Sequence, residues 1–196
     1  MINYTSNKRK QEILSTIETT TQLPVGTWNV DPVHSSIEFV ARHLMISKVR
    51  GTFQQFTGTL TIAEDPMQSK VEATAEVGSI ATGDDSRDGH LKSPDFFDVE
   101  KYPNMTLVST GIDSKGSDYV LHTDLTIRGI TKPVDFDLEF DGVSKDPWGG
   151  TRAGFAAEAE VNRKDWGLEW NVALETGGVM LGEKVKIQLD IQAVRA

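Results

Sequence analysis

Cysteine is missing from this chain of 196 residues. Disulfide bonds, thiolate metal sites and thiol nucleophiles are therefore excluded. Basic residues are also scarce, because 20 Lys and Arg stand against 29 Asp and Glu and leave a formal net charge of −9. Phosphate binding needs clustered Lys and Arg, so this balance argues against nucleic acid as a partner and against electrostatic attraction to an anionic membrane.

Long apolar runs are missing too. No stretch approaches the roughly 18 apolar residues of a membrane-spanning helix, so we expect no transmembrane segment. The basic triplet at 8–10 could open a signal peptide, but Glu and Thr interrupt the segment QEILSTIETTTQ that follows it. A secretory signal needs about 7–15 continuous apolar residues. We therefore expect an uncleaved, cytoplasmic chain.

The chain length suits one domain preceded by a short extension. Aliphatic residues at 13, 14 and 17 would form a narrow stripe on a helix over about 8–20, which Pro24 would end. The alternative for this segment is a frayed tail. We expect an N-terminal extension over 1–24 and a single β-rich domain over 25–196.

From Gly26 onward, apolar and polar residues alternate. Segment 134–141, VDFDLEFD, places four apolar side chains on one face and four acidic ones on the other. Successive strand side chains point to opposite faces, so this strand has one buried face and one wet face. The same pattern predicts strands over 35–42, 49–62, 70–77, 105–110, 119–127, 154–161 and 184–194, with 28–31 as one more candidate. Most connections are too short for crossover helices, which favours antiparallel hairpins.

About eight strands with one apolar face each can form a sandwich or a closed barrel. Alanine recurs on the apolar faces, at 73, 75, 157, 159 and 193. Such small residues either let two sheets approach or, in a closed barrel, leave an elongated apolar cavity. The candidate lining residues, which could instead be plain core, are Ile37, Phe39, Phe53, Leu107, Leu121, Leu125, Phe136, Leu138, Phe155, Ala157, Ala159, Ile187 and Leu189.

The segment RDGHLKSPDFFD, residues 87–98, lies in the longest connection between predicted strands. We expect a short helix there, capped by Asp84 or Asp85 and limited by Pro94. Its apolar residues would cover one end of the barrel, while Arg87 and Asp88 would serve as ion-pair and capping partners. The alternative is an active site, because His90 and Ser93 lie close in sequence.

The catalytic alternative lacks supporting motifs. Ser93 has no Gly-x-Ser-x-Gly elbow, and no spacing rule brings His90 to it. The histidines at 34, 43, 90 and 122 lack the spacing that places two imidazoles on one face, so we expect no metal and no cofactor. His122 and Asp124 share a strand face that should point outward. Trp166 and Trp170 would either plug the core or rim, or form a collar at a cavity mouth.

Six ordered motifs from about Gly26 onward resemble one known family. They are TWNVDPVHSSIEFVARHLMISKVRGTF, FTGTL, SIATGDDSRDGHLKSPDFFDVEKYP, LTIRGITKPV, WGLEWN and LGEKVKIQLDIQA. The chain resembles the YceI-like, lipocalin-like isoprenoid-binding proteins. This resemblance implies an all-β fold, an extended eight-stranded antiparallel barrel with a short helical insertion. It also implies frequent homodimers, and relatives that often carry a signal peptide, from which the polar extension here departs.

The resemblance further implies non-enzymatic binding, storage or transport of a polyisoprenoid lipid, such as an isoprenoid quinone or a polyprenyl compound. The lipid tail would fill the barrel, and its head group would lie near the mouth beside Arg87, His90, Phe97 and Trp166. One rival function is a hydrolase or isomerase for a small apolar substrate. Another is a stress-response or interaction protein whose cavity is incidental.

Overall fold

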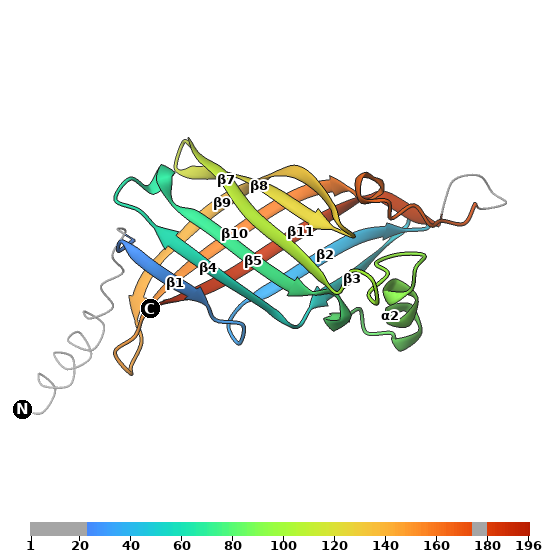
Figure 1. Ribbon diagram of the computed structural model, residues 1–196, viewed down its shortest axis with the longest axis horizontal. Coiled ribbons are helices and arrows are strands. Elements are labelled where there is room, and N and C mark those ends of the chain that lie inside the picture. The colour runs from blue at the N-terminus through green and yellow to red at the C-terminus, as the bar shows by residue number, and fades with distance from the viewer. Residues whose placement is uncertain (1–22, 174–179) are drawn as a thin grey trace, which may run out of the picture.

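The alternating segments form one antiparallel sheet that closes on itself (Figure 1). The computed structural model describes residues 23–173 and 180–196, so the predicted helix over 8–20 lies outside the described residues. The strands are β1 (Gly26–Val30), β2 (Ser36–His43), β3 (Ser47–Phe53), β4 (Phe56–Ile62), β5 (Lys70–Glu76), β6 (Ile80–Ala81), β7 (Asn104–Lys115), β8 (Asp118–Ile127), β9 (Ile130–Lys145), β10 (Thr151–Asn162) and β11 (Leu181–Arg195).

Three strands of the barrel are each interrupted and consist of two segments. β1 continues as β2, β3 as β4, and β5 as β6, and these pairs join the five continuous strands β7 to β11 in an eight-strand ring. Each of these eight strands pairs with its two neighbours in the ring, and β11 pairs with both β1 and β2 to close it. The closed barrel, rather than the sandwich, is therefore the correct alternative.

The predicted strand over 49–62 is interrupted, but not at either of its two glycines. The pairing register is regular at Gly51 and at Gly58, and the break falls between them, at residues 54–55. A Cβ on Gly51 would lie 2.4 Å from Cζ of Phe39, its partner on β2. Glycine is needed at this position because the Phe39 ring occupies the space of a side chain.

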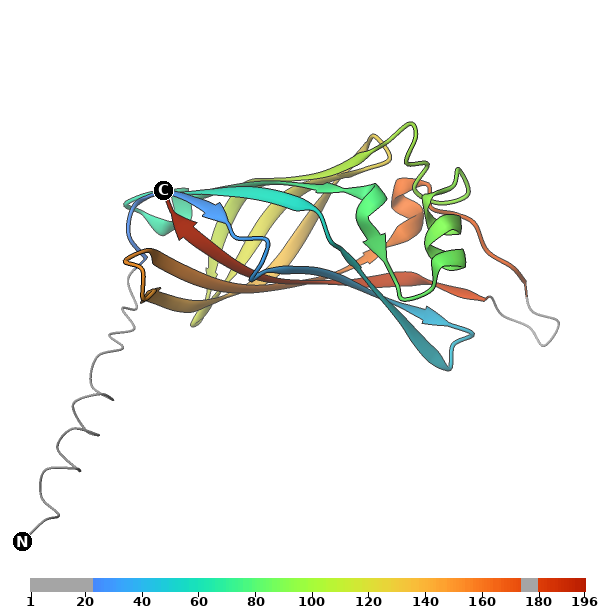
Figure 2. The ribbon, with the colours of Figure 1, turned by 90° about the horizontal axis from the view of Figure 1, so that it is seen from below.

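The predicted helical insertion is confirmed as α2 (Asp85–Lys92). Asp84 is its N-cap and accepts a hydrogen bond from the Arg87 amide at 2.8 Å. Three short 3-10 helices also occur in the described residues: η1 (Pro66–Gln68), η2 (Val77–Ser79) and η3 (Arg163–Trp166). Figure 2 shows α2 and the β2–β3 hairpin at the same end of the barrel, on opposite sides of it.

The outward prediction for the polar face of β8 is also confirmed. His122 lies between two carboxylates of the neighbouring strands, Asp135 at 2.7 Å from Nδ1 and Asp113 at 3.0 Å from Nε2. Asp124 on the same face is exposed. The opposite face of β8 is buried, and its Thr123 hydroxyl donates to the carbonyl of Val134 at 2.8 Å.

The buried residues form two clusters along the barrel axis. The smaller cluster contains Trp28, Leu60, Ile62, Val143, Ala153 and Ala193, and we name this part of the barrel the Trp28 end. The larger cluster includes Phe53, Phe96 and Trp166 and extends to the end that carries α2 and η3, which we name the helix end. None of the helices in the described ranges is long and apolar enough to cross a membrane.

Candidate ligand-binding cavity

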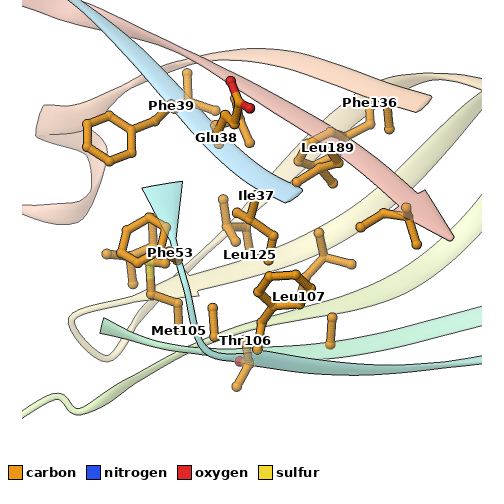
Figure 3. Close-up of a pocket in the computed structure, with 18 of the residues that line it drawn as sticks. Ile37, Glu38, Phe39, Phe53, Met105, Thr106, Leu107, Leu125, Phe136 and Leu189 are labelled. Carbon is orange, nitrogen blue, oxygen red and sulfur yellow. The ribbon is translucent and has the colours of Figure 1, made fainter. Parts of the chain in front are cut away.

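A cavity of about 800 Å³ lies inside the barrel. Ligand pockets commonly measure about 300–1,000 Å³, so this volume suits a molecule of substantial size. Figure 3 shows apolar side chains from β2, β3, β7, β8, β9 and β11 pointing into a common space. The cavity extends from His43 and Trp170 at the helix end to Leu23 and Met67 near the other end.

The structure brings together nearly all the residues that the sequence nominated. The lining includes Ile37, Phe39, Phe53, Leu107, Leu121, Leu125, Phe136, Leu138, Phe155, Ala157, Ile187, Leu189, Arg87, His90, Phe97 and Trp166. Ala159 is the exception. Its single methyl group is buried in the larger core cluster and does not reach the cavity surface.

Further lining residues continue the same alternation. Ala41, inside the predicted strand 35–42, and His43, just beyond it, follow Ile37 and Phe39 along β2 and also face the cavity. Trp170 also lines the cavity but lies in a loop, outside any alternating run. The period of two could have extended the list along the strands, whereas residues in the loops carry no such signal.

An aromatic cluster surrounds the cavity at the helix end. The His90 ring lies edge-on to Phe96 and to Trp170, with ring centroids 5.1 and 4.7 Å apart, and Phe96 is 5.2 Å from Trp170. Phe97 lies edge-on to Phe53 at 5.9 Å. The residues after α2 therefore pack directly against the barrel wall, as the covering role predicted for this segment requires.

Thr82 anchors α2 to the barrel. The Arg87 guanidinium donates from Nε to the Thr82 hydroxyl at 2.7 Å and from Nη2 to its carbonyl at 2.9 Å. The Asp88 carboxylate accepts from the Thr82 amide at 2.9 Å and from its hydroxyl. Arg87 and Asp88 therefore fix the helical segment, as expected, but they do so through hydrogen bonds to Thr82, which follows β6, and not through an ion pair or a helix cap.

The side chains of the catalytic alternative do not meet one another. His90 Nε2 lies 2.9 Å from the Asp95 carboxylate. The Ser93 hydroxyl donates to the backbone carbonyl of His90 at 2.7 Å, and Ser93 is the C-cap of α2. A nucleophile needs its base within hydrogen-bond reach of the hydroxyl, and here that hydroxyl bonds to the helix backbone.

The tryptophans divide between the two alternatives. Trp166 is buried, and its indole N–H donates to the carbonyl of Leu125 at 3.1 Å, which fits a core plug. Trp170 is only partly buried and packs against the rings of His90 and Phe96, which fits a collar. Trp28 fills the opposite end, where its indole donates to the carbonyl of Pro24 at 3.0 Å. Trp148, on the β9–β10 turn, is 87% exposed.

Arg163 is a buried cation that the sequence analysis missed. It begins η3, is 4% exposed and lines the cavity. Its Nε donates to the carbonyl of Gly182 at 3.0 Å, and its Nη1 donates to the carbonyl of Leu168. Burial lowers the pKa of its guanidinium, an effect that the negative charge of Glu183 opposes. The signal was present, because Arg163 continues the odd-numbered inward face of β10.

The β2–β3 turn exposes apolar side chains at the helix end. Met45 and Ile46 are 61% and 82% exposed. Leu44 and Met45 both have left-handed φ angles, of 51° and 59°, in a turn closed by a hydrogen bond from the Ile46 amide to the His43 carbonyl. Asn and Gly favour this backbone conformation, so Leu and Met are held there at a conformational cost.

An eight-stranded antiparallel barrel around an apolar cavity, with a helix packed at one end, defines a lipocalin-like protein. The family model described as a YceI-like domain matches residues 28–193. The chain therefore belongs to the YceI-like family. A UPF0312 protein of Staphylococcus epidermidis is 44% identical over 163 residues, which cover 82% of this chain and 93% of that one. A Staphylococcus aureus UPF0312 protein is 43% identical over 160 residues, 81% and 91% of the two chains.

Solved structures share the fold at lower identity. The Burkholderia cenocepacia protein BcnA aligns with a TM-score of 0.69 at 21% identity, covering 83% of this chain and 98% of its own. A Campylobacter jejuni YceI protein aligns at 0.68 and 23% identity over 100% and 99% of the two chains. A polyisoprenoid-binding domain from Saccharophagus degradans aligns at 0.65 and 15% identity over 88% and 100%. Each of these likenesses establishes the fold alone.

Proposed function

We propose that the chain binds a long isoprenoid lipid, such as a quinone tail or a polyprenyl compound, inside the barrel and stores or transports it. The observation that carries this proposal is the cavity of about 800 Å³, whose walls are mainly aliphatic and aromatic side chains. The Saccharophagus degradans domain described as polyisoprenoid-binding has the same fold, which adds support.

The physical basis of binding would be transfer of the tail from water to the cavity. Each buried CH₂ group contributes about 0.8 kcal/mol. Ordering the flexible chain opposes this gain, but a tail of several isoprene units retains a net benefit without any polar contact. Selectivity would then follow the length and cross-section of the cavity.

Native mass spectrometry of the purified protein tests the proposal directly. We expect a mass increment above the chain mass of 21.6 kDa that organic extraction removes, and we expect the extract to contain an isoprenoid lipid. The same spectra report whether two copies associate. Protein that neither carries a lipid nor takes up an added polyprenyl compound would refute the proposal.

A pair of variants on β10 separates cavity volume from folding. Ala157 lines the cavity, whereas Ala156, the preceding residue, lies on the other face of the strand and does not. Ala157→Phe should abolish most lipid uptake and lower the free energy of unfolding by about 1–3 kcal/mol through overpacking. Ala156→Phe should leave uptake unchanged. Equal uptake by well-folded Ala157→Phe and wild-type protein would show that the lining assignment is wrong.

A further inference from the structure

Arg163 lines the cavity and carries a hydrogen-bond donor that no residue in 23–173 or 180–196 satisfies. The residue is 4% exposed, and the donor is its buried Nη2 atom. Its other two nitrogens bind the carbonyls of Gly182 and Leu168, which hold the guanidinium in place. A buried donor without a partner is unfavourable in a folded protein, so the position calls for an acceptor from outside the chain.

The charge of Arg163 also has no carboxylate partner in the part of the chain that the structure describes. Both of its acceptors are neutral carbonyls, and none of the ion pairs in the described residues includes it. The carboxylate of Glu183 acts on it electrostatically, but Lys164 already binds that carboxylate at 2.5 Å. A buried cation without a counter-ion favours an anion over a neutral group at the same position.

The surroundings of Arg163 place this charge beside an apolar volume. Trp166, Leu168 and Leu181 line the same cavity. Arg87, held by Thr82, contributes a second cation to the lining. A ligand that satisfies both features has an apolar chain and an anionic end.

We propose that Arg163 binds the head group of an anionic amphiphile, a phosphate or carboxylate, whose tail fills the barrel. This inference rests on the proposed lipid-binding function and narrows its ligand class. The guanidinium offers Nη2 to an anionic oxygen in a charge-assisted hydrogen bond. Neutral alcohols of the same chain length bind through the tail alone.

Three ligands with one tail test the assignment: farnesyl phosphate, farnesoic acid and farnesol. Each competes with the neutral dye Nile red, whose fluorescence reports cavity occupancy. The wild-type protein should bind the phosphate and the carboxylate at least about tenfold more tightly than the alcohol, a ratio that corresponds to about 1.4 kcal/mol. Arg163→Gln should reduce this ratio toward one while the affinity for farnesol stays the same. Arg163→Lys should keep part of it, because lysine retains the charge without the planar fork.

Lys184→Gln is the matched control. It removes one positive charge whose ammonium pairs with Glu160 and is 76% exposed, and it should leave the ratio unchanged. Equal affinity of the wild-type protein for all three ligands would overturn the head-group assignment and leave the lipid cavity intact, even if no Arg163 variant folds. A wild-type ratio in Arg163→Gln would overturn it as well. Failure of Nile red and of every ligand to bind would refute the proposed function itself.

Discussion

The two ends of the barrel border one cavity but are built from different chemistry. At the Trp28 end a fully buried indole packs in one cluster with the small residues Ala153 and Ala193. At the helix end Trp166 is equally buried, but the same short 3-10 helix holds the cation Arg163, and the covering segment contributes His90. Apolar complementarity stabilises a fold, whereas buried polar groups cost stability and are kept for a use. The comparison therefore separates an end filled by apolar packing from an end whose buried cation supports the proposed binding of a head group.

Trp28→Ala tests the packed end and should have the largest effect. Removing a fully buried large aromatic side chain leaves a void that the neighbouring alanines cannot fill. We expect the free energy of unfolding, measured by denaturant titration, to fall by about 3–5 kcal/mol. Trp148→Ala removes the same side chain from an exposed turn and should change it by less than about 0.5 kcal/mol. Equal losses in the two variants would contradict the packing role of Trp28.

Asp31→Asn tests the ion-pair network at the Trp28 end and should have the next largest effect on the free energy of unfolding. The Asp31 carboxylate accepts from Arg152, which also binds Asp146 and Gln192, so the network joins the β1–β2 loop to the β9–β10 turn. The hydrogen bond from Arg152 is the main cause that lowers the pKa of Asp31 from 3.8 to about 2, and the bond with His34 adds to it.

The sign of this pKa change predicts a pH dependence. The folded state binds the proton more weakly than the unfolded state, so the stabilisation is complete above pH 3.8 and is lost as the pH falls toward about 2. Asp31→Asn should be less stable than the wild-type protein at neutral pH, and the difference should shrink through this window. A difference that stays constant from neutral pH to pH 2 would show that the carboxylate charge is not responsible.

Asp84→Ala tests the attachment of the helix end. Loss of the N-cap should destabilise α2 by about 1 kcal/mol. Hydrogen exchange of the α2 amides should accelerate more than that of the barrel strands, because the helix opens locally. Asp85→Ala, which removes a first-turn charge without touching the cap, should have a smaller effect. Acceleration that is uniform over the whole protein would indicate that α2 and the barrel open together.

Met45→Gly should have the smallest effect, and of opposite sign. Met45 has a φ of 59° and is 61% exposed, so glycine relieves the backbone without removing buried surface. We expect the thermal midpoint to rise slightly, with a gain of less than about 1 kcal/mol. Met67→Gly, on η1 at the other end, offers no such relief and should not stabilise. A loss of stability in Met45→Gly would show that the exposed turn contributes to packing.

The strands were predictable because each has one buried and one wet face. In β9 every second residue of 134–141 is acidic, so the acidic face must lie toward solvent and the apolar face toward the core. Ring closure had no comparable local signal, because it joins Trp28 to Arg195 across almost the whole chain. The helix α2 was predictable from Asp84 and Pro94. Its attachment to Thr82 was not, because no local pattern indicates that Arg87 and Asp88 would both bind that residue.

The lining of the cavity was predictable along the strands and less predictable at the helix end. The alternating positions identified the walls, but Trp170 meets His90 from a loop far away in sequence. Arg163 was missed because a charged residue after a strand reads as part of a solvated turn. The inward-facing residues of β10 are the odd-numbered ones from Phe155 to Val161. Only the continuation of this alternation to Arg163 indicates that its side chain also points inward.

If the barrel binds a lipid as proposed, the junction between β2 and β11 couples lipid binding to folding. Part of the cavity wall comes from β2 and β11, whose side chains Ile37 and Leu189 face each other in register across this junction. A barrel opened at this junction has no complete container, so a lipid that binds only the closed form stabilises it by mass action, by about 2.7 kcal/mol at a hundredfold excess over its dissociation constant. We therefore expect protein with bound lipid to resist separation of β2 from β11. Removal of the lipid should make this junction open more readily.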